Sequence, residues 1–328
     1  MKNTLRLLAH SGILLLGVWL GMAPVNAQEV FPSRPIRVIV PQTTGTGGDI
    51  YARLMAEKMR QELGQSVVVD NRPGANGVIA MSFLAKQQAD GYTLLLAGVS
   101  QMAFNQHLYK ATPYDVTKDF TYVAPTVEVP FILVASKKSG IKSPADLMAL
   151  SRTKPGGVNF ASGGVGNSTH LAMEMLAVRA GIKASHVPYP GTSGALLSVV
   201  SGETDVMVSP LPVALAQINS GGLVPVAVLS AARLTQVPSV PTLKESGLDV
   251  PFMPGWYALI GPAGMDQAVA QKLNAAVQKM FVDPEIKAKL DAMSMVVVGG
   301  TSAGNRERAI NESRTWGELI RAQRLQVE

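Results

Sequence analysis

Three loops of the sequence combine glycine with hydroxyl and amide side chains, a combination that can bind a small anion. They are residues 43–49 (Thr-Thr-Gly-Thr-Gly-Gly-Asp), 162–169 (Ser-Gly-Gly-Val-Gly-Asn-Ser-Thr) and 189–194 (Tyr-Pro-Gly-Thr-Ser-Gly). Because they contain neither Lys nor Arg, an anion would be held by backbone N–H groups, hydroxyls and the positive end of a following helix. The alternative is that the glycines only turn the chain and that Asp49 only caps a helix.

Each loop lies between a predicted strand and a predicted helix. Continuous apolar residues indicate the strands, and apolar residues at helical spacing indicate the helices. Such units predict α/β sheets, in which the loops after the strands gather at one edge and bind ligands. The repetition therefore favours a shared binding site over three independent turns. The strand and helix pairs are 36–40 with 50–63, 158–161 with 170–179, and 185–187 with 195–201.

The same alternation predicts two domains. It restarts near Phe120, and a proline-rich connector at 237–254 leads the chain back. We expect an α/β fold in which each domain is a mostly parallel sheet flanked by helices. Residues 28–128 with 252–328 would form domain 1 and residues 129–251 domain 2, with the ligand cleft between them. Further expected strands are 67–69, 92–97, 131–135, 205–208, 223–229 and 256–260, and further expected helices are 78–88, 266–281 and 284–293.

The amino terminus has the pattern of a secretory signal peptide. A short basic start and an apolar run from Leu7 to Leu20 precede small residues that end at Ala27. A membrane anchor is the weaker alternative because the apolar run is short. We therefore expect cleavage after Ala27 and a soluble, monomeric protein in the periplasm. Cleavage lowers the formal net charge from +6 to +4, because residues 1–27 contain two basic and no acidic side chains.

The composition excludes several classes of function. A hydrophobic content of 47% with 16% charged residues argues against disorder. The absence of cysteine excludes disulfides and thiolate metal sites, and the four histidines lack metal-ligand spacing. The scattered positive charge and the aromatic content of 5% do not suit a nucleic-acid surface. We expect no metal, no cofactor and no nucleic-acid partner.

Two alternatives to simple anion binding fit the motifs less well. Residues 45–50 end in isoleucine where the dinucleotide fingerprint has its third glycine, and they lack the lysine of a P-loop. Residues 191–195 come within one residue of a nucleophile elbow, so an exported serine esterase or hydrolase using Ser193 or Ser168 is the alternative function. In that architecture a histidine follows the serine, but the last histidine, His186, precedes Ser193. We therefore expect a binding protein and not an enzyme.

Six motifs occur in order along almost the whole mature chain. They are residues 31–41, the loop ending in Gly48-Asp49, and residues 69–75, 90–95, 166–171 and 189–191. Together they resemble the Bug-type periplasmic solute-binding proteins of tripartite tricarboxylate transporters. The resemblance implies two α/β domains of the Venus-flytrap, type II-like kind. These domains would close on a carboxylate-bearing solute and deliver it to the permease subunits in the membrane.

The resemblance also implies which residues bind the ligand. The segment from Thr43 to Gly47 would receive one carboxylate, partly through backbone N–H groups and waters, and Asp205 would brace the second loop. His170 is an additional candidate because an imidazole can donate to a carboxylate, and residues 98–101 form a polar turn after a strand. The expected ligand-binding residues are Thr43, Thr44, Gly45, Thr46, Gly47, Ser100, Gln101, Ser162, Asn167, Ser168, His170, Tyr189, Gly191, Thr192 and Asp205.

The sequence departs from the family at two places. Gln42-Thr43-Thr44 stand where Phe-Pro-Pro usually follows the proline, and Pro190 stands where a basic residue is common. More hydroxyls and one charge fewer predict recognition by neutral hydrogen bonds, and they favour a dicarboxylate over a citrate-like ligand. An aromatic dicarboxylate such as terephthalate is one option. A receptor that signals through a partner without transport is a further alternative, which the sequence does not separate from a transport receptor.

Overall fold

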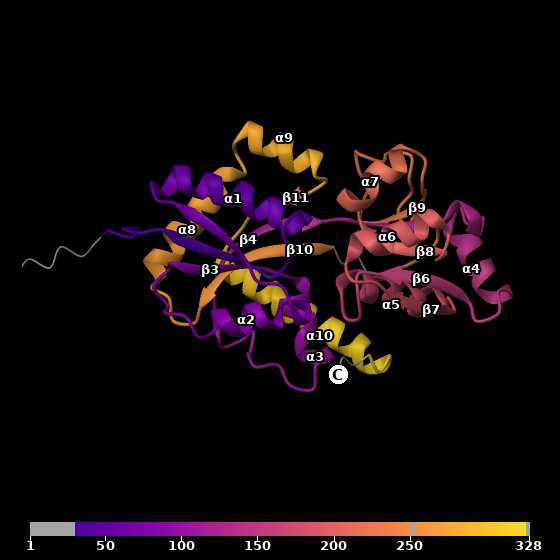
Figure 1. The fold of residues 1–328 in the computed structure, drawn as a ribbon, viewed down its shortest axis with the longest axis horizontal. Coiled ribbons are helices and arrows are strands. Elements are labelled where there is room, and N and C mark those ends of the chain that lie inside the picture. Colours follow the sequence, from indigo (N-terminus) through magenta and orange to yellow (C-terminus); the bar gives the residue numbers. More distant parts are fainter. Residues whose placement is uncertain (1–29, 251–253, 326–328) are drawn as a thin grey trace, which may run out of the picture.

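The computed structural model describes residues 30–250 and 254–325. The predicted signal peptide at 1–27 and the second domain boundary at 251/252 fall outside the described residues. Figure 1 shows two α/β halves beside each other, one built on a six-stranded sheet and the other on a five-stranded sheet. We call them domain 1 and domain 2. The two-domain α/β class is confirmed, whereas the boundary at 128/129 stays a prediction.

Domain 1 is built on a sheet with the strand order β11-β4-β10-β3-β1-β2. Its strands are β1 (Ile36–Val40), β2 (Val67–Asn71), β3 (Thr93–Gly98), β4 (Phe120–Val129), β10 (Gly255–Pro262) and β11 (Val296–Val297). Its helices are α1 (Gly47–Leu63), α2 (Val78–Leu84), α3 (Asn105–Leu108), α8 (Gln267–Met280), α9 (Pro284–Ala292) and α10 (Ser302–Ala322). A 3₁₀ turn, η1 (Ala75–Gly77), and a π-helix, η2 (Ser100–Phe104), precede α2 and α3.

Domain 2 is built on a sheet with the strand order β7-β6-β8-β5-β9. Its strands are β5 (Phe131–Ala135), β6 (Val158–Ser162), β7 (Ala184–Pro188), β8 (Val206–Pro210) and β9 (Val224–Leu229). Its helices are α4 (Pro144–Thr153), α5 (Ser168–Ala180), α6 (Thr192–Ser201) and α7 (Leu211–Asn219), with a 3₁₀ turn, η3 (Lys137–Ser139).

Both sheets are mixed, which corrects the expectation of mostly parallel sheets. β1 is parallel to β2 and β3, whereas β10 is antiparallel to β3 and β4. In domain 2, β6 is parallel to β7 and β8, whereas β5 is antiparallel to β8 and β9. The antiparallel direction of β5 and β10 has a topological cause. The chain enters domain 2 through β5 and re-enters domain 1 through β10, and each of these strands begins at the edge of its sheet where its neighbours end.

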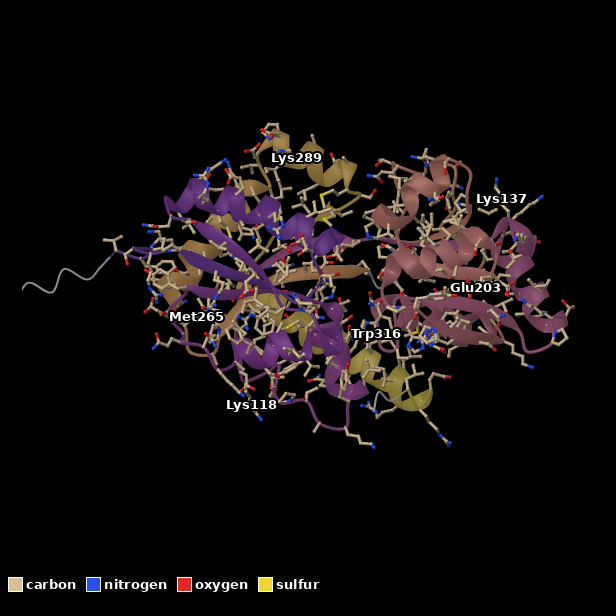
Figure 2. The ribbon with its side chains drawn as sticks, viewed as in Figure 1. Lys118, Lys137, Glu203, Met265, Lys289 and Trp316 are labelled. Atoms are coloured by element: carbon tan, nitrogen blue, oxygen red, sulfur yellow. The ribbon has the colours of Figure 1, made fainter. Side chains whose placement is uncertain are left out.

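Helices cover both faces of each sheet, and apolar side chains fill the space between the layers. On one face of domain 1, Trp316 of α10, labelled in Figure 2, packs edge-on against Phe104 with ring centroids 4.7 Å apart. The same cluster includes two residues of domain 2, Leu171 (0% exposed) and Met175 (3%), both from α5. Full burial of such a side chain contributes about 1.5–3 kcal/mol. The two domains therefore share a packed apolar contact next to α10.

Within residues 30–250 and 254–325, none of the helices combines the length and the apolar character that a membrane span requires.

Candidate functional site

The strand ends place loop 1 (residues 43–49) at the edge of domain 1 that faces domain 2. β4 ends at Val129 and β5 begins at Phe131, so these ends of the two sheets face each other, as Figure 1 shows. Gly255 pairs with Val129, and Tyr257 pairs with Gly98 at the end of β3. Because β1 runs parallel to β3, loop 1 emerges at the same edge.

Loop 2 (residues 162–169) and loop 3 (residues 189–194) emerge at the opposing edge of domain 2. Phe131, the first residue of β5, pairs with Pro210 and Leu229, the last residues of β8 and β9. β6 and β7 run in the same direction as β8, so the loops that follow them also lie at this edge. All three predicted loops therefore emerge where the domains face each other.

Loop 1 ends in a reciprocal helix cap. The hydroxyl of Thr46 accepts a hydrogen bond from the Asp49 N–H at 3.4 Å, and the Asp49 carboxylate accepts one from the Gly45 N–H at 2.9 Å. Helix α1 therefore begins at Gly47, three residues before the predicted start. Its first N–H groups, of Gly47 and Gly48, have no acceptor within the helix and no hydrogen bond to another residue of the described chain. Gly47 is partly exposed, whereas Gly48 is buried, so the Gly47 N–H is the more accessible of the two to an anion.

Asp49 does more than cap the helix. Its side chain is 2% exposed and lies 2.9 Å from the Arg53 guanidinium, while Asn71 Nδ2 donates to it at 3.0 Å. Burial alone would raise the pKa of Asp49, but the hydrogen bonds from Arg53, Gly45 and Asn71 outweigh burial and lower it. The carboxylate is therefore ionised and neutralised by Arg53, and it ties loop 1 to the end of β2.

Loop 2 is closed by neutral groups. The Asn167 side chain accepts hydrogen bonds from the Thr169 N–H at 2.9 Å and the Thr169 hydroxyl at 3.0 Å. That hydroxyl accepts in turn from the Gly163 N–H at 3.0 Å. Ser162 is fully buried, and its Oγ lies 2.6 Å from His186 Nε2. Asn167 and Ser168 are partly exposed, whereas the Ser162 side chain faces the protein interior.

Two stacked imidazoles support loop 2 from beneath. The rings of His170 and His186 lie 3.8 Å apart, and Phe160 stacks on His186 at 4.8 Å. His170 is 3% exposed, its Nδ1 accepts from the Gly166 N–H at 3.2 Å, and its Nε2 lies 3.6 Å from Glu174. Burial, together with the His170 ring, lowers the pKa of His186 to about 4. The His170 ring is therefore enclosed in this structure and positions the loop, and its contact with a ligand stays a prediction.

Loop 3 lies directly against loop 2. The Tyr189 N–H donates to the Ser162 carbonyl at 2.9 Å. A Cβ added to Gly163 would lie 2.9 Å from the Thr192 hydroxyl, so glycine is required for this close approach. Gly191 adopts a φ of 103° as the residue before α6, and α6 begins at Thr192 instead of the predicted Ala195. Loops 2 and 3 thus form one continuous surface with the partly exposed Thr192 on it.

Ser100 and Gln101 do not form the predicted polar turn. They belong to the π-helix η2, and their side chains are 8% and 5% exposed. Gln101 Oε1 accepts from the Gly98 N–H at 2.9 Å, and Gln101 Nε2 donates to the Asn76 carbonyl at 2.8 Å. Both residues are therefore buried, and Gln101 supports the neighbouring backbone, while their contact with a ligand stays a prediction.

Asp205 does not brace loop 2, which corrects an implied role. Its carboxylate binds Lys154 Nζ at 2.5 Å and accepts from the Asn159 N–H, near the start of β6, at 2.7 Å. Its carbonyl accepts from the N–H of Ser136, just after the end of β5. Lys137, the next residue, lies at the end of domain 2 away from domain 1 (Figure 2). Asp205 therefore stabilises the edge of the sheet opposite the loops.

Sequence reasoning missed three polar residues beside loop 1. Gln42 Nε2 donates to the Tyr257 hydroxyl at 3.3 Å, and a Cβ on Gly48 would overlap the Gln42 side chain. Asn71 Nδ2 also donates to the Gln42 carbonyl at 3.0 Å. The departure from the family at Gln42 was visible in the sequence. Its partners Tyr257 and Asn71 come from distant strands, and local spacing does not reveal them.

A separate cavity of about 400 Å³ lies in domain 2, away from the three loops. It is lined by the start of α4, the start of β9 and residues 239–246 of the connector. It shares no residue with the predicted site, so it is a rival location that a ligand-bound structure would distinguish. Within the described ranges, His, Asp and Glu side chains form no group of three or more that could hold a metal ion.

Comparison with known proteins identifies the family. Residues 51–325 match the model of the TctC family, described as the tripartite tricarboxylate transporter family receptor. The chain belongs to this family. It is 34% identical to protein BugT of Bordetella pertussis, over 97% of this chain and 98% of that protein. TctC proteins are periplasmic receptors that bind solutes and are not enzymes, so membership overturns the serine hydrolase alternative.

Solved structures of similar proteins contain carboxylates. An R. palustris protein solved with adipate is 29% identical, with a TM-score of 0.83, over 89% of this chain and 97% of that one. MatC from Rhodopseudomonas palustris, solved with bound malate, is 27% identical, with a TM-score of 0.80, over 88% of this chain and all of that one. Both structural alignments extend over the two domains of this TctC receptor.

Proposed function

We propose that this receptor captures a small organic dicarboxylate between loop 1 of domain 1 and loops 2 and 3 of domain 2. The observation that carries the proposal is the start of α1, at the edge facing domain 2, where the N–H groups of the partly exposed Gly47 and of the buried Gly48 have no acceptor among the described residues. Loops 2 and 3 oppose it with the partly exposed polar residues Asn167, Ser168 and Thr192. Thr43, Thr44 and Gly45 are exposed beside α1 and extend the proposed site.

Recognition would rest on neutral groups. A helix N-terminus stabilises an anion by about 0.3–1 kcal/mol, and by up to ~2 kcal/mol where the site is partly buried. A hydrogen bond to a charged group contributes about 1.5–3 kcal/mol. The nearby basic side chain of Arg53 is already paired with Asp49, which leaves the N–H groups and hydroxyls to meet the ligand. The adipate and malate bound by the two similar receptors support a dicarboxylate.

Capture would proceed by domain closure. Loop 1 belongs to one domain and loops 2 and 3 to the other, so one ligand can meet all of them only when the domains approach. A ligand with more contacts in the closed state shifts the equilibrium toward that state. The short crossing between Val129 and Phe131 is one of the two segments that would bend. The closed receptor would then deliver the solute to the permease subunits of a tripartite tricarboxylate transporter.

A thermal-shift panel tests the ligand class. Malate, adipate, terephthalate and citrate would be compared with glucose and arginine. A ligand at 100 times its Kd stabilises by about 2.7 kcal/mol, which raises Tm by roughly 5–10 °C at about 2–4 °C per kcal/mol. We expect shifts with one or more dicarboxylates and smaller shifts with citrate. Shifts with glucose or arginine alone would reject the carboxylate proposal.

The partner and the export step need separate tests. In the source bacterium, deletion of the gene for this protein should abolish uptake of the dicarboxylate that gives the largest thermal shift, and re-expression should restore uptake. Unchanged uptake with a lost transcriptional response to the same compound would favour signalling over transport. Export with cleavage after Ala27 predicts Gln28 as the first residue of the periplasmic protein, which amino-terminal sequencing would check.

A further inference from the structure

The turn at residues 74–77 has an unusual backbone. Gly74, Ala75, Asn76 and Gly77 follow one another with φ values of 130°, 45°, 48° and 88°. Four consecutive residues with positive φ are disfavoured for L-amino acids, above all at Ala75, which has a Cβ and no polar side chain to compensate. Such a turn persists only where its surroundings hold it, and its contacts therefore show what it positions.

Buried amides of domain 1 hold this turn. The Asn76 carbonyl accepts from Gln101 Nε2 at 2.8 Å and from Asn105 Nδ2 at 3.1 Å. Asn105 is fully buried, and its Nδ2 also donates to the Tyr114 hydroxyl at 3.2 Å. A Cβ on Gly77 would lie 2.6 Å from Gln101 Nε2, so glycine is required there. The turn is thus fixed by side chains that lie outside the proposed ligand contacts.

The held side chain reaches across to domain 2. Asn76 Nδ2 donates to Asn105 Oδ1 at 2.9 Å and to the Gly166 carbonyl of loop 2 at 3.0 Å. Both amide hydrogens are therefore used, one within domain 1 and one between domains. The Gly166 N–H donates to His170 Nδ1. Loop 2 is therefore held at Gly166 from both sides: the N–H bonds to its own domain, and the carbonyl bonds to domain 1.

We propose that Asn76 is a positioning residue that holds loop 2 in its ligand-binding shape only while the two domains are in contact. This inference rests on the proposed function, because loop 2 is part of the proposed ligand site. Opening of the domains breaks the bond from Asn76 to Gly166, and loop 2 then retains only its contacts within domain 2. Ligand binding and the interdomain hydrogen bond therefore strengthen each other.

Three variants isolate this bond. Asn76→Gly keeps the left-handed backbone available and removes the side chain, and with it the bonds to Asn105 and to Gly166. Asn76→Asp keeps the size of the side chain but places carboxylate oxygens against two acceptors, Asn105 Oδ1 and the Gly166 carbonyl. Ala75→Gly is the matched control, because Ala75 is exposed and its replacement relieves backbone strain without changing the Asn76 amide.

Two readouts are combined. Amide hydrogen exchange of residues 163–171 is measured in the full mature protein, with and without adipate or malate, and the ligand dissociation rate is measured by stopped flow. We expect Asn76→Gly to speed dissociation roughly 2- to 12-fold, which corresponds to a neutral hydrogen bond of about 0.5–1.5 kcal/mol. It should also speed exchange in residues 163–171 several-fold. Asn76→Asp should have the larger effect, and Ala75→Gly should match the wild type.

The outcomes separate this inference from the proposed function. If the wild type binds adipate or malate while Asn76→Gly leaves both dissociation and exchange unchanged, the positioning role is rejected and the proposed function stands. If the wild type binds neither compound nor any other carboxylate of the panel, the proposed function fails. The exchange comparison then still decides whether Asn76 holds loop 2. Faster exchange in Asn76→Gly and Asn76→Asp, with Ala75→Gly unchanged, supports the role, and equal exchange in all variants overturns it.

Discussion

Loop 1 and loop 2 have the same outline, a glycine-containing turn that leads into a helix, but different chemistry fixes their shapes. Loop 1 is fixed by an ion pair between the buried Asp49 and the half-exposed Arg53, within its own domain. Loop 2 is fixed by stacked imidazoles of its own domain and by an amide from the other domain. In the proposed site, loop 1 would therefore be the preformed half, whereas loop 2 would depend on the contact between the domains.

Removal of the Asp49 charge from loop 1 should have the largest effect on stability and on dicarboxylate binding. In Asp49→Asn, an amide N–H₂ would face donors from Gly45, Arg53 or Asn71, and charge-assisted hydrogen bonds would be lost. We expect a loss of about 2–3 kcal/mol in the free energy of unfolding, a fall in Tm of roughly 5 °C or more, and weaker dicarboxylate binding. Calorimetry would measure both properties.

Asp205 offers a matched control for this substitution. It is likewise a carboxylate paired with a basic residue, Lys154, but it is only partly buried and lies at the far edge of domain 2. Asp205→Asn should lower Tm and leave the dicarboxylate Kd unchanged. Equal losses of affinity in the two variants would show that loop 1 has no special part in binding.

Separation of loops 2 and 3 should have the next largest effect. In Gly163→Ala, the new Cβ would lie 2.9 Å from the Thr192 hydroxyl oxygen and 3.0 Å from the Thr192 backbone nitrogen. Overpacking of this kind costs about 1–3 kcal/mol, so we expect dicarboxylate affinity to fall roughly 5- to 150-fold in isothermal titration. Gly194→Ala is the control, because its Cβ would meet only Tyr189 at 4.0 Å. Wild-type affinity in Gly163→Ala would show that the contact between loops 2 and 3 does not shape the site.

As the pH is lowered, loop 2 should lose stability at a higher pH than loop 1. The pKa of His186 is lowered from 6.5 to about 4, so between these values the unfolded state binds more protons than the folded state. Its contribution to stability is full above pH 6.5 and is lost as the pH falls toward 4. Asp49, whose folded pKa lies below 3.8, loses its contribution only at lower pH. Relative to the intrinsic exchange rate at each pH, protection should therefore fall in residues 162–170 near pH 5 while residues 43–50 stay protected; the reverse order would contradict the comparison.

The helix cap of loop 1 should have the smallest effect. Thr46→Ala removes the hydroxyl that accepts from the Asp49 N–H and should cost about 1 kcal/mol in the free energy of unfolding. Thr46→Ser keeps the hydroxyl and should behave as the wild type in denaturant titration. An equal loss in both variants would assign the effect to the Thr46 methyl group and not to the cap.

The sequence predicted the parts of the site that depend on local pattern. Apolar strands followed by polar loops placed loops 1, 2 and 3 at strand ends, and the register confirms that placement. The sequence predicted the starts of α1 and α6 three residues too late, because the glycine and threonine residues of the first turn have weak helix propensity. Caps and tertiary contacts compensate for this weakness.

Elements whose sequence conflicts with their structure were missed. β4 contains Pro125, which argues against a central strand, yet the strand accommodates it where the pairing with β10 shifts register between Trp256 and Ala258. The long helix α10 and the helix α7 were also not predicted. The contacts of Asn76 and Asp205 connect residues 90 and 46 positions apart, so only the folded chain brings the partners together.

The central claim is that neutral groups from both domains hold one carboxylate ligand. A crystal structure with the dicarboxylate that gives the largest thermal shift tests it most directly. We predict one carboxylate within about 2.7–3.2 Å of the Gly47 or Gly48 nitrogen, with the remainder of the ligand against Asn167, Ser168 or Thr192. A ligand bound to one domain only, seated in the cavity beside α4, or held mainly by Lys or Arg side chains would contradict the account.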